Sequence, residues 1–426
     1  MGCATEHMFC FSCNLRRLVR AAFILSLLPL LAACGGGASD TALPFPPAGP
    51  DSAPDPMSFG PFPVGAITLE MEDPSREDPE TGGPRSFKLE IWYPAVQGTR
   101  DLSPWTYETW TDASEEYLGE DYQKLVDAAL PGMQSEAVRD ADMDTAHAPY
   151  PLVLFSHGSY GIRWQSVFYT VHLASHGYVV AAPDHKGNTV WELLRDGYDE
   201  GTTMVSSQQR LFDIDFVLDE LKERNADHAD FLFGAIDEDN IAASGHSFGG
   251  WTAFTAACNN PHILASVSQS PILGLAEIYG CVLAEYPVPA MVMGGTLDNT
   301  VPFKDQYCDY RAVTAPEMYL YQIEGGGHYT FSDICDLDLA ALAKDFDFGP
   351  AEEALQDGCS QTENVPWHEA HKSINHYSTA FLNLHLRASP GCVDYLVEFS
   401  AAPFDAVTFH AGTVPDWPAG GCPAGK

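Results

Sequence analysis

Residues 241–250 read IAASGHSFGG, a short apolar run that ends in a serine between two glycines. A Gly-x-Ser-x-Gly pattern is weak by itself, but here it follows a predicted strand and opens a predicted helix. Glycine suits positions Gly245 and Gly249 because a sharp strand-to-helix turn leaves no room for larger side chains. We therefore predict a nucleophile elbow that holds the hydroxyl of Ser247 at the edge of a sheet.

Short β-rich runs alternate with helical stretches on both sides of this motif. Several runs are continuously apolar, such as PLVLFSHG and YVVAAPDH, which is typical of parallel strands buried on both faces. We expect strands at 66–71, 87–93, 152–156, 178–182, 241–244, 265–268, 288–293 and 318–323. We expect helices at 166–175, 209–223, 251–258 and about 368–386. This alternation predicts an α/β fold with a mostly parallel, doubly wound sheet of about eight strands.

Candidates for the acid and the base follow the elbow in the chain order that such a site requires. Residues 296–302 read TLDNTVP and place Asp298 on a loop at the carboxyl edge of the sheet. Residues 325–330 read GGGHYT and place His328 on the loop after the next strand. We predict that this histidine takes the proton of Ser247 as general base while the aspartate fixes its tautomer.

The same site needs two backbone N–H groups that stabilise an oxyanion. One is predicted from Phe248, directly after the nucleophile, and the other from the loop FSHGSYG, where we assign Ser159. Aromatic residues near these loops are candidates for an acyl pocket, with core packing as the alternative: Tyr160, Trp164, Trp191 and Tyr329.

Four segments carry a resemblance to a known family: FSHGSYG, LASHGYVVAAPDHKGNT, IDEDNIAASGHSFGG and GGGHYTF. They resemble the plasma type of platelet-activating factor acetylhydrolase and bacterial proteins labelled predicted dienelactone hydrolases, from about residue 87 to residue 386. The resemblance implies an α/β-hydrolase fold and a carboxylic ester hydrolase that needs no metal and no cofactor. It also implies the nucleophile, base and oxyanion roles for Ser247, His328, Phe248 and Ser159.

The chain departs from that family at several positions. In the plasma acetylhydrolase the acid follows the sixth strand, where this chain reads SVSQSPILG without a carboxylate. Asp298 instead resembles the acid of cutinases and polyester hydrolases. True dienelactone hydrolases carry a cysteine in the elbow. Polyester hydrolases that bind aromatic polymers place tryptophans where this chain has His246 and Ser270-Pro271.

From these patterns we expect a serine ester hydrolase that acts on short-chain or phospholipid-type esters. Polyester hydrolysis, as in cutinases, is the alternative within the same chemistry. A catalytically inactive surface-binding lipoprotein is a third interpretation, which the presence of all three triad residues disfavours.

The N-terminus carries an expected export signal. Three arginines precede an apolar run at 21–31 that is too short to span a membrane as an ordinary helix, so residues 1–33 are typical of a signal peptide. The sequence LAAC ending at Cys34 resembles the lipobox of bacterial lipoproteins, which implies lipidation of this cysteine. Gly35 favours the outer membrane by resemblance to sorting rules, and ordinary secretion is the alternative.

Composition divides the rest of the chain into three further parts. We expect a Gly/Pro-rich tether at 34–61, a hydrolase domain at 62–390 with insertions near the site at about 101–148 and 331–367, and a C-terminal extension at 391–426 packed on it. The insertions are either lids or surface decoration.

A formal net charge of −38 repels nucleic acid and anionic lipid headgroups. The expected partners are therefore an ester substrate and, through the anchor at Cys34, a membrane, and we expect a monomer. Export permits disulfides, and sequence proximity alone suggests Cys335 with Cys359 and Cys392 with Cys422.

Overall fold

The computed structural model describes residues 56–78, 80–107, 133–337, 356–396, 406–417 and 421–422. These residues belong to one compact unit that spans 40–426. The predicted signal peptide, Cys34, most of the predicted tether and large parts of both predicted insertions lie outside them. Within the described residues, no helix has the length and apolar character that a membrane crossing requires.

The centre of the fold is a ten-stranded sheet, in the order β12-β11-β10-β9-β8-β6-β7-β2-β1-β5. Its strands are β1 Val64–Glu77, β2 Pro84–Pro94, β5 Ala137–Arg139, β6 Tyr150–Ser156, β7 Val179–Pro183, β8 Ile236–His246, β9 Ile263–Gln269, β10 Ala290–Gly295, β11 Met318–Ile323 and β12 Val407–Ala411. In this order, all neighbouring pairs between β11 and β7 are parallel, and so is the pair β1–β5. The pairs β1–β2, β2–β7 and β11–β12 are antiparallel. A separate two-stranded ladder joins β3 Thr106–Tyr107 to β4 Met133–Gln134.

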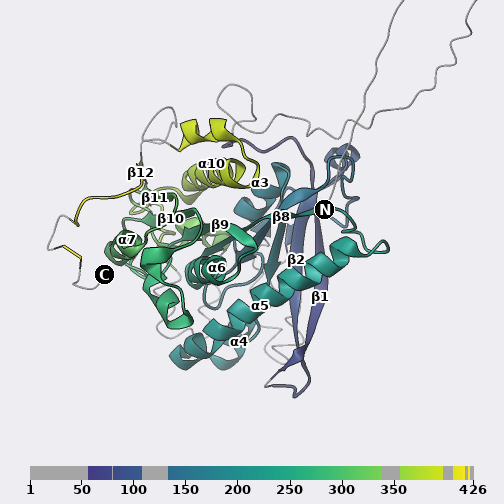
Figure 1. The fold of residues 1–426 in the computed structure, drawn as a ribbon, viewed down its shortest axis with the longest axis horizontal. Coiled ribbons are helices and arrows are strands. Elements are labelled where there is room, and N and C mark those ends of the chain that lie inside the picture. Colours follow the sequence, from purple (N-terminus) through teal and green to yellow (C-terminus); the bar gives the residue numbers. More distant parts are fainter. Residues whose placement is uncertain are drawn as a thin grey trace, which may run out of the picture. The chain divides into compact units, whose positions relative to one another are not determined.

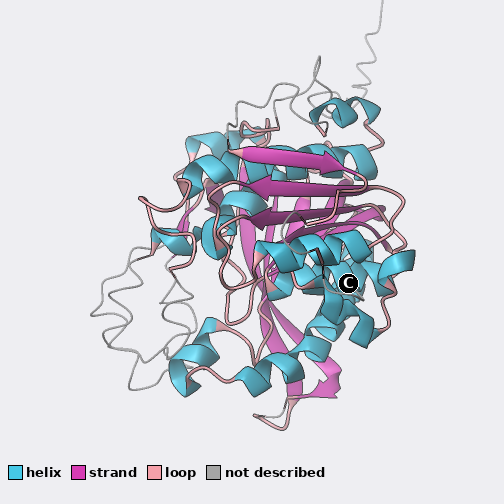
Figure 2. Ribbon diagram, turned by 90° about the vertical axis from the view of Figure 1, so that its left-hand side faces the viewer, coloured by secondary structure: helices cyan, strands magenta, loops and turns pink. Residues whose placement is uncertain are grey.

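Helices cover both faces of this sheet (Figures 1 and 2). They are α3 Val167–Ser175, α4 Val190–Asp196, α5 Glu200–Ala226, α6 Phe248–Asn259, α7 Phe303–Ala312 and α10 Trp367–Leu386. Short 3-10 turns lie at Gln97–Asp101, Leu273–Tyr279, Leu283–Glu285, His328–Phe331, Asp333–Asp336 and Pro390–Tyr395. Helices α3 and α10 pack on one face, and α5, α6 and α7 pack on the other.

Strand β6 illustrates why the sequence folds this way. All of its residues are buried, and successive side chains point to opposite faces of the sheet. Val153 and Phe155 belong to the cluster under α3 and α10, whereas Leu152 and Leu154 belong to the cluster under α5 and α6. A continuous apolar run is therefore what a strand between two helical layers requires.

The predicted strands and helices are all present, with longer bounds in most cases. The predicted strand count was too low, because β5 is very short and β12 lies in the C-terminal extension. β12 extends the sheet at the edge of β11, with Tyr319 opposite Ala411 and Ile323 opposite Val407. Part of the extension therefore completes the sheet.

The structure contains one of the two expected disulfides and corrects the other. Cys335 is bonded to Cys359, but Cys422 is bonded to Cys308 on α7. Cys392 is a buried thiol whose pKa burial raises to about 11. The pairing of Cys392 with Cys422 was wrong because the chain runs back along the sheet edge and past α7, which sequence proximity does not reveal. A further disulfide, between residues 258 and 281, was not predicted.

Candidate active site

Ser247 lies at the sharp turn between β8 and α6. Its backbone has φ 56° and ψ −122°, and such a φ in a residue other than glycine costs on the order of 1–3 kcal/mol. A Cβ atom at Gly249 would lie 1.9 Å from the carbonyl oxygen of Ser156, and one at Gly245 would lie 2.3 Å from that of Gly249. Close backbone packing therefore requires both glycines, as the elbow pattern predicts.

The structure brings Ser247, Asp298 and His328 together at the carboxyl edge of the sheet. The Nε2 atom of His328 lies 2.8 Å from Oγ of Ser247, and its Nδ1 atom lies 2.9 Å from Oδ2 of Asp298. An ionised carboxylate only accepts hydrogen bonds, so Nδ1 carries the proton and the lone pair of Nε2 faces the serine hydroxyl. Asp298 and His328 are buried and Ser247 is half-buried, an arrangement that suits proton transfer from the hydroxyl.

Two further groups fix the carboxylate of Asp298. The backbone N–H of Val301 donates to its Oδ1 over 2.7 Å, and the Nε2 group of Gln306 donates to its Oδ2 over 3.0 Å. The same Nε2 group also donates to the carbonyl of Val301. Gln306 lies on α7, and no sequence pattern connected this helix with the site.

The two predicted oxyanion donors come from the elbow and from the loop after β6. Phe248 is the first residue of α6, where a backbone N–H has no partner inside the helix. In the loop after β6, the N–H of Gly158 donates to Oε1 of Gln165 over 2.8 Å, and the predicted donor Ser159 directly follows it. No described residue accepts from the N–H groups of Phe248 and Ser159. Their use as an oxyanion hole stays a prediction.

His246, directly before the candidate nucleophile, links the loop after β6 to the loop of His328. The Nε2 group of Gln165 lies 2.8 Å from its Nδ1 atom, and its Nε2 atom lies 2.9 Å from the carbonyl oxygen of His328. Because Oε1 of Gln165 already accepts from Gly158, its amide nitrogen donates to Nδ1, and Nε2 of His246 donates to His328. Burial lowers the pKa of His246 far below its usual value, which keeps the ring neutral. The sequence singles out residue 246 only as a position where polyester hydrolases that bind aromatic polymers have tryptophan.

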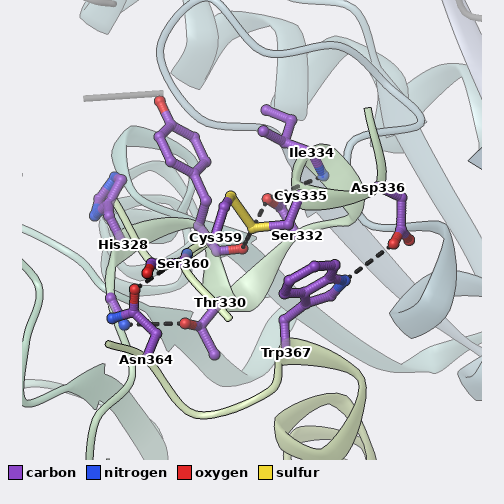
Figure 3. The surroundings of a disulfide bond; sticks show 12 residues. His328, Thr330, Ser332, Ile334, Cys335, Asp336, Cys359, Ser360, Asn364 and Trp367 are labelled. Carbon is purple, nitrogen blue, oxygen red and sulfur yellow. Dashed lines mark hydrogen bonds between the residues drawn. A yellow bond between two sulfur atoms is a disulfide. The ribbon is translucent and has the colours of Figure 1, made fainter. Parts of the chain in front are cut away.

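The Cys335–Cys359 disulfide lies next to the loop that carries His328 (Figure 3). Backbone packing between the two segments is very close, since a Cβ atom at Gly327 would lie 2.5 Å from Cα of Gly358. The disulfide therefore holds a distant part of the chain against the candidate base.

Asp357, in that same segment, joins the loops of the base and the acid. Its carbonyl accepts from the N–H of Tyr329 over 2.7 Å, beside the candidate base. Its Oδ2 accepts from the N–H groups of Asn299 and Thr300 over 2.9 and 2.8 Å, directly after Asp298. Asp357 lies in the predicted second insertion, whose role the sequence left open.

The four aromatic pocket candidates fall into two groups. Trp164 and Trp191 are each 2% exposed and belong to the core cluster, so they fill the interior instead of lining a pocket. Tyr160 belongs to the same cluster but is 9% exposed, and its hydroxyl donates to the carbonyl of Asp199 over 3.0 Å. Tyr329 is half-buried beside the candidate base. Contact of these two tyrosines with an acyl group stays a prediction.

A second hydrogen-bonded group of serine, histidine and aspartate lies buried near the elbow. Nε2 of His185 lies 3.1 Å from Oγ of Ser156, and its Nδ1 atom lies 3.0 Å from Oδ2 of Asp213. The preceding Asp184 accepts from Nη1 of Arg163 over 2.7 Å. The hydroxyl of Ser156 is buried, whereas Ser247 is half-buried, so this second group stabilises the loops after β6 and β7 and does not present a serine to a substrate.

Comparison with known proteins agrees with these structural features. Residues 51–197 match the family described as platelet-activating factor acetylhydrolase, isoform II, and residues 153–343 match the family described as PET hydrolase-like. A ferulic acid esterase from Streptomyces cinnamoneus superposes with a TM-score of 0.57 at 23% identity, covering 82% of this chain and 96% of that chain. This protein has the α/β-hydrolase fold.

Two curated relatives are platelet-activating factor acetylhydrolases. The one from Canis lupus familiaris is 24% identical over 230 residues, which are 43% of this chain and 48% of that protein. The one from Bos taurus is 27% identical over 173 residues, which are 30% of this chain and 36% of that protein. The chain thus spans less than half the length of these relatives. It resembles both the acetylhydrolases and the polyester hydrolases, as the sequence motifs predicted.

Proposed function

We propose that this protein is a serine carboxylic ester hydrolase that works through an acyl-enzyme. The observation that carries the proposal is the position of His328, whose two ring nitrogens contact the hydroxyl of Ser247 and the carboxylate of Asp298 at 2.8 and 2.9 Å. The positive φ of Ser247 supports it, because backbone strain of this kind clusters at functional sites.

In the proposed reaction, Oγ of Ser247 attacks the ester carbonyl carbon as its proton moves to Nε2 of His328. The N–H groups of Phe248 and Ser159 stabilise the oxyanion of the tetrahedral intermediate. The carbon–oxygen bond to the alcohol breaks, and the histidine gives its proton to the departing oxygen. Water then gives a proton to the same nitrogen as its oxygen attacks the acyl carbon. The bond from this carbon to Oγ of Ser247 breaks, Oγ takes the proton back from His328, and the acid leaves.

Short-chain or phospholipid-type esters are the proposed substrates. The match of residues 51–197 to the acetylhydrolase family supports this choice. Polyesters are the second candidate, supported by the PET hydrolase-like match at 153–343, which contains Ser247, Asp298 and His328. A series of p-nitrophenyl esters from acetate to laurate, together with polyester particles, separates the two candidates.

The test uses the purified chain and its Ser247→Ala variant, at low salt and at high salt. We expect ester hydrolysis and covalent labelling by a fluorophosphonate for the natural chain, and a loss of several orders of magnitude for the variant. A folded natural chain that neither hydrolyses any ester nor labels would refute the proposal and favour the inactive binding protein.

We further propose that the protein is exported and anchored to the bacterial cell envelope through a lipid on Cys34. The LAAC sequence after an apolar run supports this proposal. Membrane fractionation of cells that express the natural chain or Cys34→Ser tests it. Recovery of both proteins in the same soluble fraction would show that there is no anchor.

A further inference from the structure

Arg210 lies on α5 and is fully buried, beside the loop after β6. Its guanidinium group donates to neutral oxygen acceptors. They are Oδ1 of Asn188 at 2.6 Å, the carbonyl of His157 at 2.7 Å and the carbonyl of Gly158 at 2.9 Å. Burial lowers the pKa of Arg210 to about 9, so the side chain is still a cation at neutral pH.

The carbonyl of Gly158 belongs to the same peptide unit as the N–H of Ser159. In a trans peptide the C=O and the N–H point in opposite directions. Binding of the carbonyl by Arg210 therefore fixes the N–H of Ser159 so that it points away from the guanidinium. A charged donor on the carbonyl also polarises the peptide and makes its N–H a stronger donor.

A second donor strengthens this effect on the same carbonyl. The Nδ1 atom of His157 lies 2.7 Å from the carbonyl oxygen of Gly158, and its Nε2 atom accepts from the N–H of His185 over 3.0 Å. The proton of this ring is therefore on Nδ1, and the ring donates to Gly158. The N–H of Gly161 donates to the same oxygen over 3.1 Å. The peptide before Ser159 is thus held by two neutral donors and one cationic donor.

Arg210 also contacts the residue that supplies the other N–H. Its Cζ atom lies 4.5 Å from the ring centroid of Phe248, a cation–π geometry. Asn188 completes the group, since it accepts from Arg210 and donates to Oγ of Ser159 over 3.2 Å. One buried cation therefore supports both sides of the predicted oxyanion hole.

We propose that Arg210 is a positioning residue for the oxyanion hole, which orients and polarises the peptide N–H of Ser159 and fixes the ring of Phe248. The inference rests on the proposed ester hydrolysis. Arg210 acts on the developing oxyanion through these two residues. Its contribution therefore belongs to the transition state, where negative charge appears on the carbonyl oxygen, and only weakly to substrate binding.

The chain offers a matched control in Arg387. This arginine donates to the backbone carbonyls of His176 and Gly177, and its Cζ atom lies 4.3 Å from the ring centroid of Tyr178. Both arginines thus bind two consecutive carbonyls and one aromatic ring. Arg387 does so before β7, at the opposite end of the strands from Ser247, so its loss reports only the structural effect.

The experiment compares Arg210→Met and Arg210→Lys with Arg387→Met and Arg387→Lys in the full chain. The readouts are kcat and KM for p-nitrophenyl butyrate, active-site titration with a fluorophosphonate, and thermal unfolding. We expect Arg210→Met to lower kcat by roughly 10- to 10²-fold, less than the loss of a whole oxyanion donor because the N–H of Ser159 itself remains, with KM changed less than about threefold. Arg210→Lys keeps the charge without the planar guanidinium, so its kcat should lie between those of Arg210→Met and the natural chain. The Arg387 variants should keep kcat within about threefold of the natural chain.

A second variant covers the case in which Arg210→Met does not fold. Asn188→Asp has nearly the same shape and places a carboxylate against Arg210, which cancels the cation. We expect its kcat, and its affinity for a trifluoromethyl ketone that forms an oxyanion on Ser247, to fall by the same factor of about 10. A kcat equal to that of the natural chain in Asn188→Asp overturns the inference.

The outcomes also separate this inference from the proposed function. If the natural chain hydrolyses esters but the Arg210 and Arg387 variants lose kcat equally, the role of Arg210 is refuted and the proposed esterase function stands. The same holds if the Arg210 variants change only KM. A natural chain that is folded but neither hydrolyses esters nor reacts with the fluorophosphonate refutes both.

Discussion

His246 donates a hydrogen bond from Nε2 to the backbone carbonyl of His328 over 2.9 Å, so the residue before the candidate nucleophile holds the candidate base. The orientation of this ring is set by Gln165, whose side chain also accepts from Gly158 in the loop that carries Ser159. One short chain of hydrogen bonds therefore connects the predicted oxyanion loop with the predicted base.

Breaking this connection should impair catalysis more than stability. We predict that His246→Phe and Gln165→Leu each lower kcat about tenfold, because the loop of His328 loses its fixed position while the apolar volume is retained. The double variant should lose no more than either single variant, since both remove the same connection. Steady-state kinetics on the three variants gives the coupling, and losses that simply multiply would show that the two residues act independently.

The elbow was predictable because its geometry leaves few choices. Gly249 approaches the backbone of Ser156 so closely that only glycine fits, and the following strands deliver Asp298 and His328 in a fixed chain order. Gln165 carries no such signal, because its contact with residue 246 is tertiary. A single glutamine on a loop has the same local pattern whether it faces solvent or the site.

Asp298 is predicted to act through the tautomer of His328. We expect Asp298→Asn to lower kcat on the order of 10⁴-fold, because an amide at this position favours the wrong ring tautomer. Asp309→Asn is the matched control, since Asp309 is also buried and also accepts a backbone N–H, in this case from Gly274 in the turn Leu273–Tyr279. Kinetics and circular dichroism on both variants test the role, and equal losses in the two would contradict it.

The disulfides mark a limit of reasoning from sequence. Cys308 and Cys422 are 114 residues apart, and only the path of β12 along β11 brings their Cα atoms within 5.5 Å. Cys335 and Cys359 are close in sequence, but nothing in the sequence indicated that their segment packs against the loop of His328.

Two disulfides of nearly equal loop length separate stability from catalysis. Cys335–Cys359 has a sequence separation of 24 and Cys258–Cys281 one of 23. Replacing either pair by serine should therefore cost a similar free energy of unfolding, about 3 kcal/mol by loop entropy. Only the first pair lies beside His328. We predict a kcat reduced about tenfold for Cys335→Ser/Cys359→Ser and an unchanged kcat for Cys258→Ser/Cys281→Ser.

Urea unfolding and ester hydrolysis on both double variants test this prediction. Equal kcat values for the two variants would show that Asp357 holds the loops of Asp298 and His328 without help from the disulfide. In that case Asp357→Ala, which removes the acceptor of the Asn299 and Thr300 N–H groups, should still lower kcat.

Buried histidines should make the fold sensitive to mild acid. Burial lowers the pKa of His185 to about 4 and that of His371 to about 3, against an ordinary value near 6.5. Between these values and pH 6.5 the unfolded chain binds protons that the folded chain does not. The stabilising contribution is therefore complete above pH 6.5 and is lost as the pH falls, at about 1.4 kcal/mol per pH unit for each histidine.

Asp333 acts in the opposite direction, because burial raises the pKa of its carboxyl to about 8. Between about pH 8 and the ordinary value near 3.8, the folded chain therefore holds a proton that the unfolded chain lacks. Burial also raises the pKa of Asp215, but these two carboxyls are outnumbered, because burial lowers the pKa values of His157, His172, His246 and His385 as well. We therefore predict that the free energy of unfolding, measured in urea, falls between about pH 6.5 and pH 4.5. His371→Phe should make this fall shallower by about 1.4 kcal/mol per pH unit. A slope that is the same with and without the His371 ring would contradict the prediction.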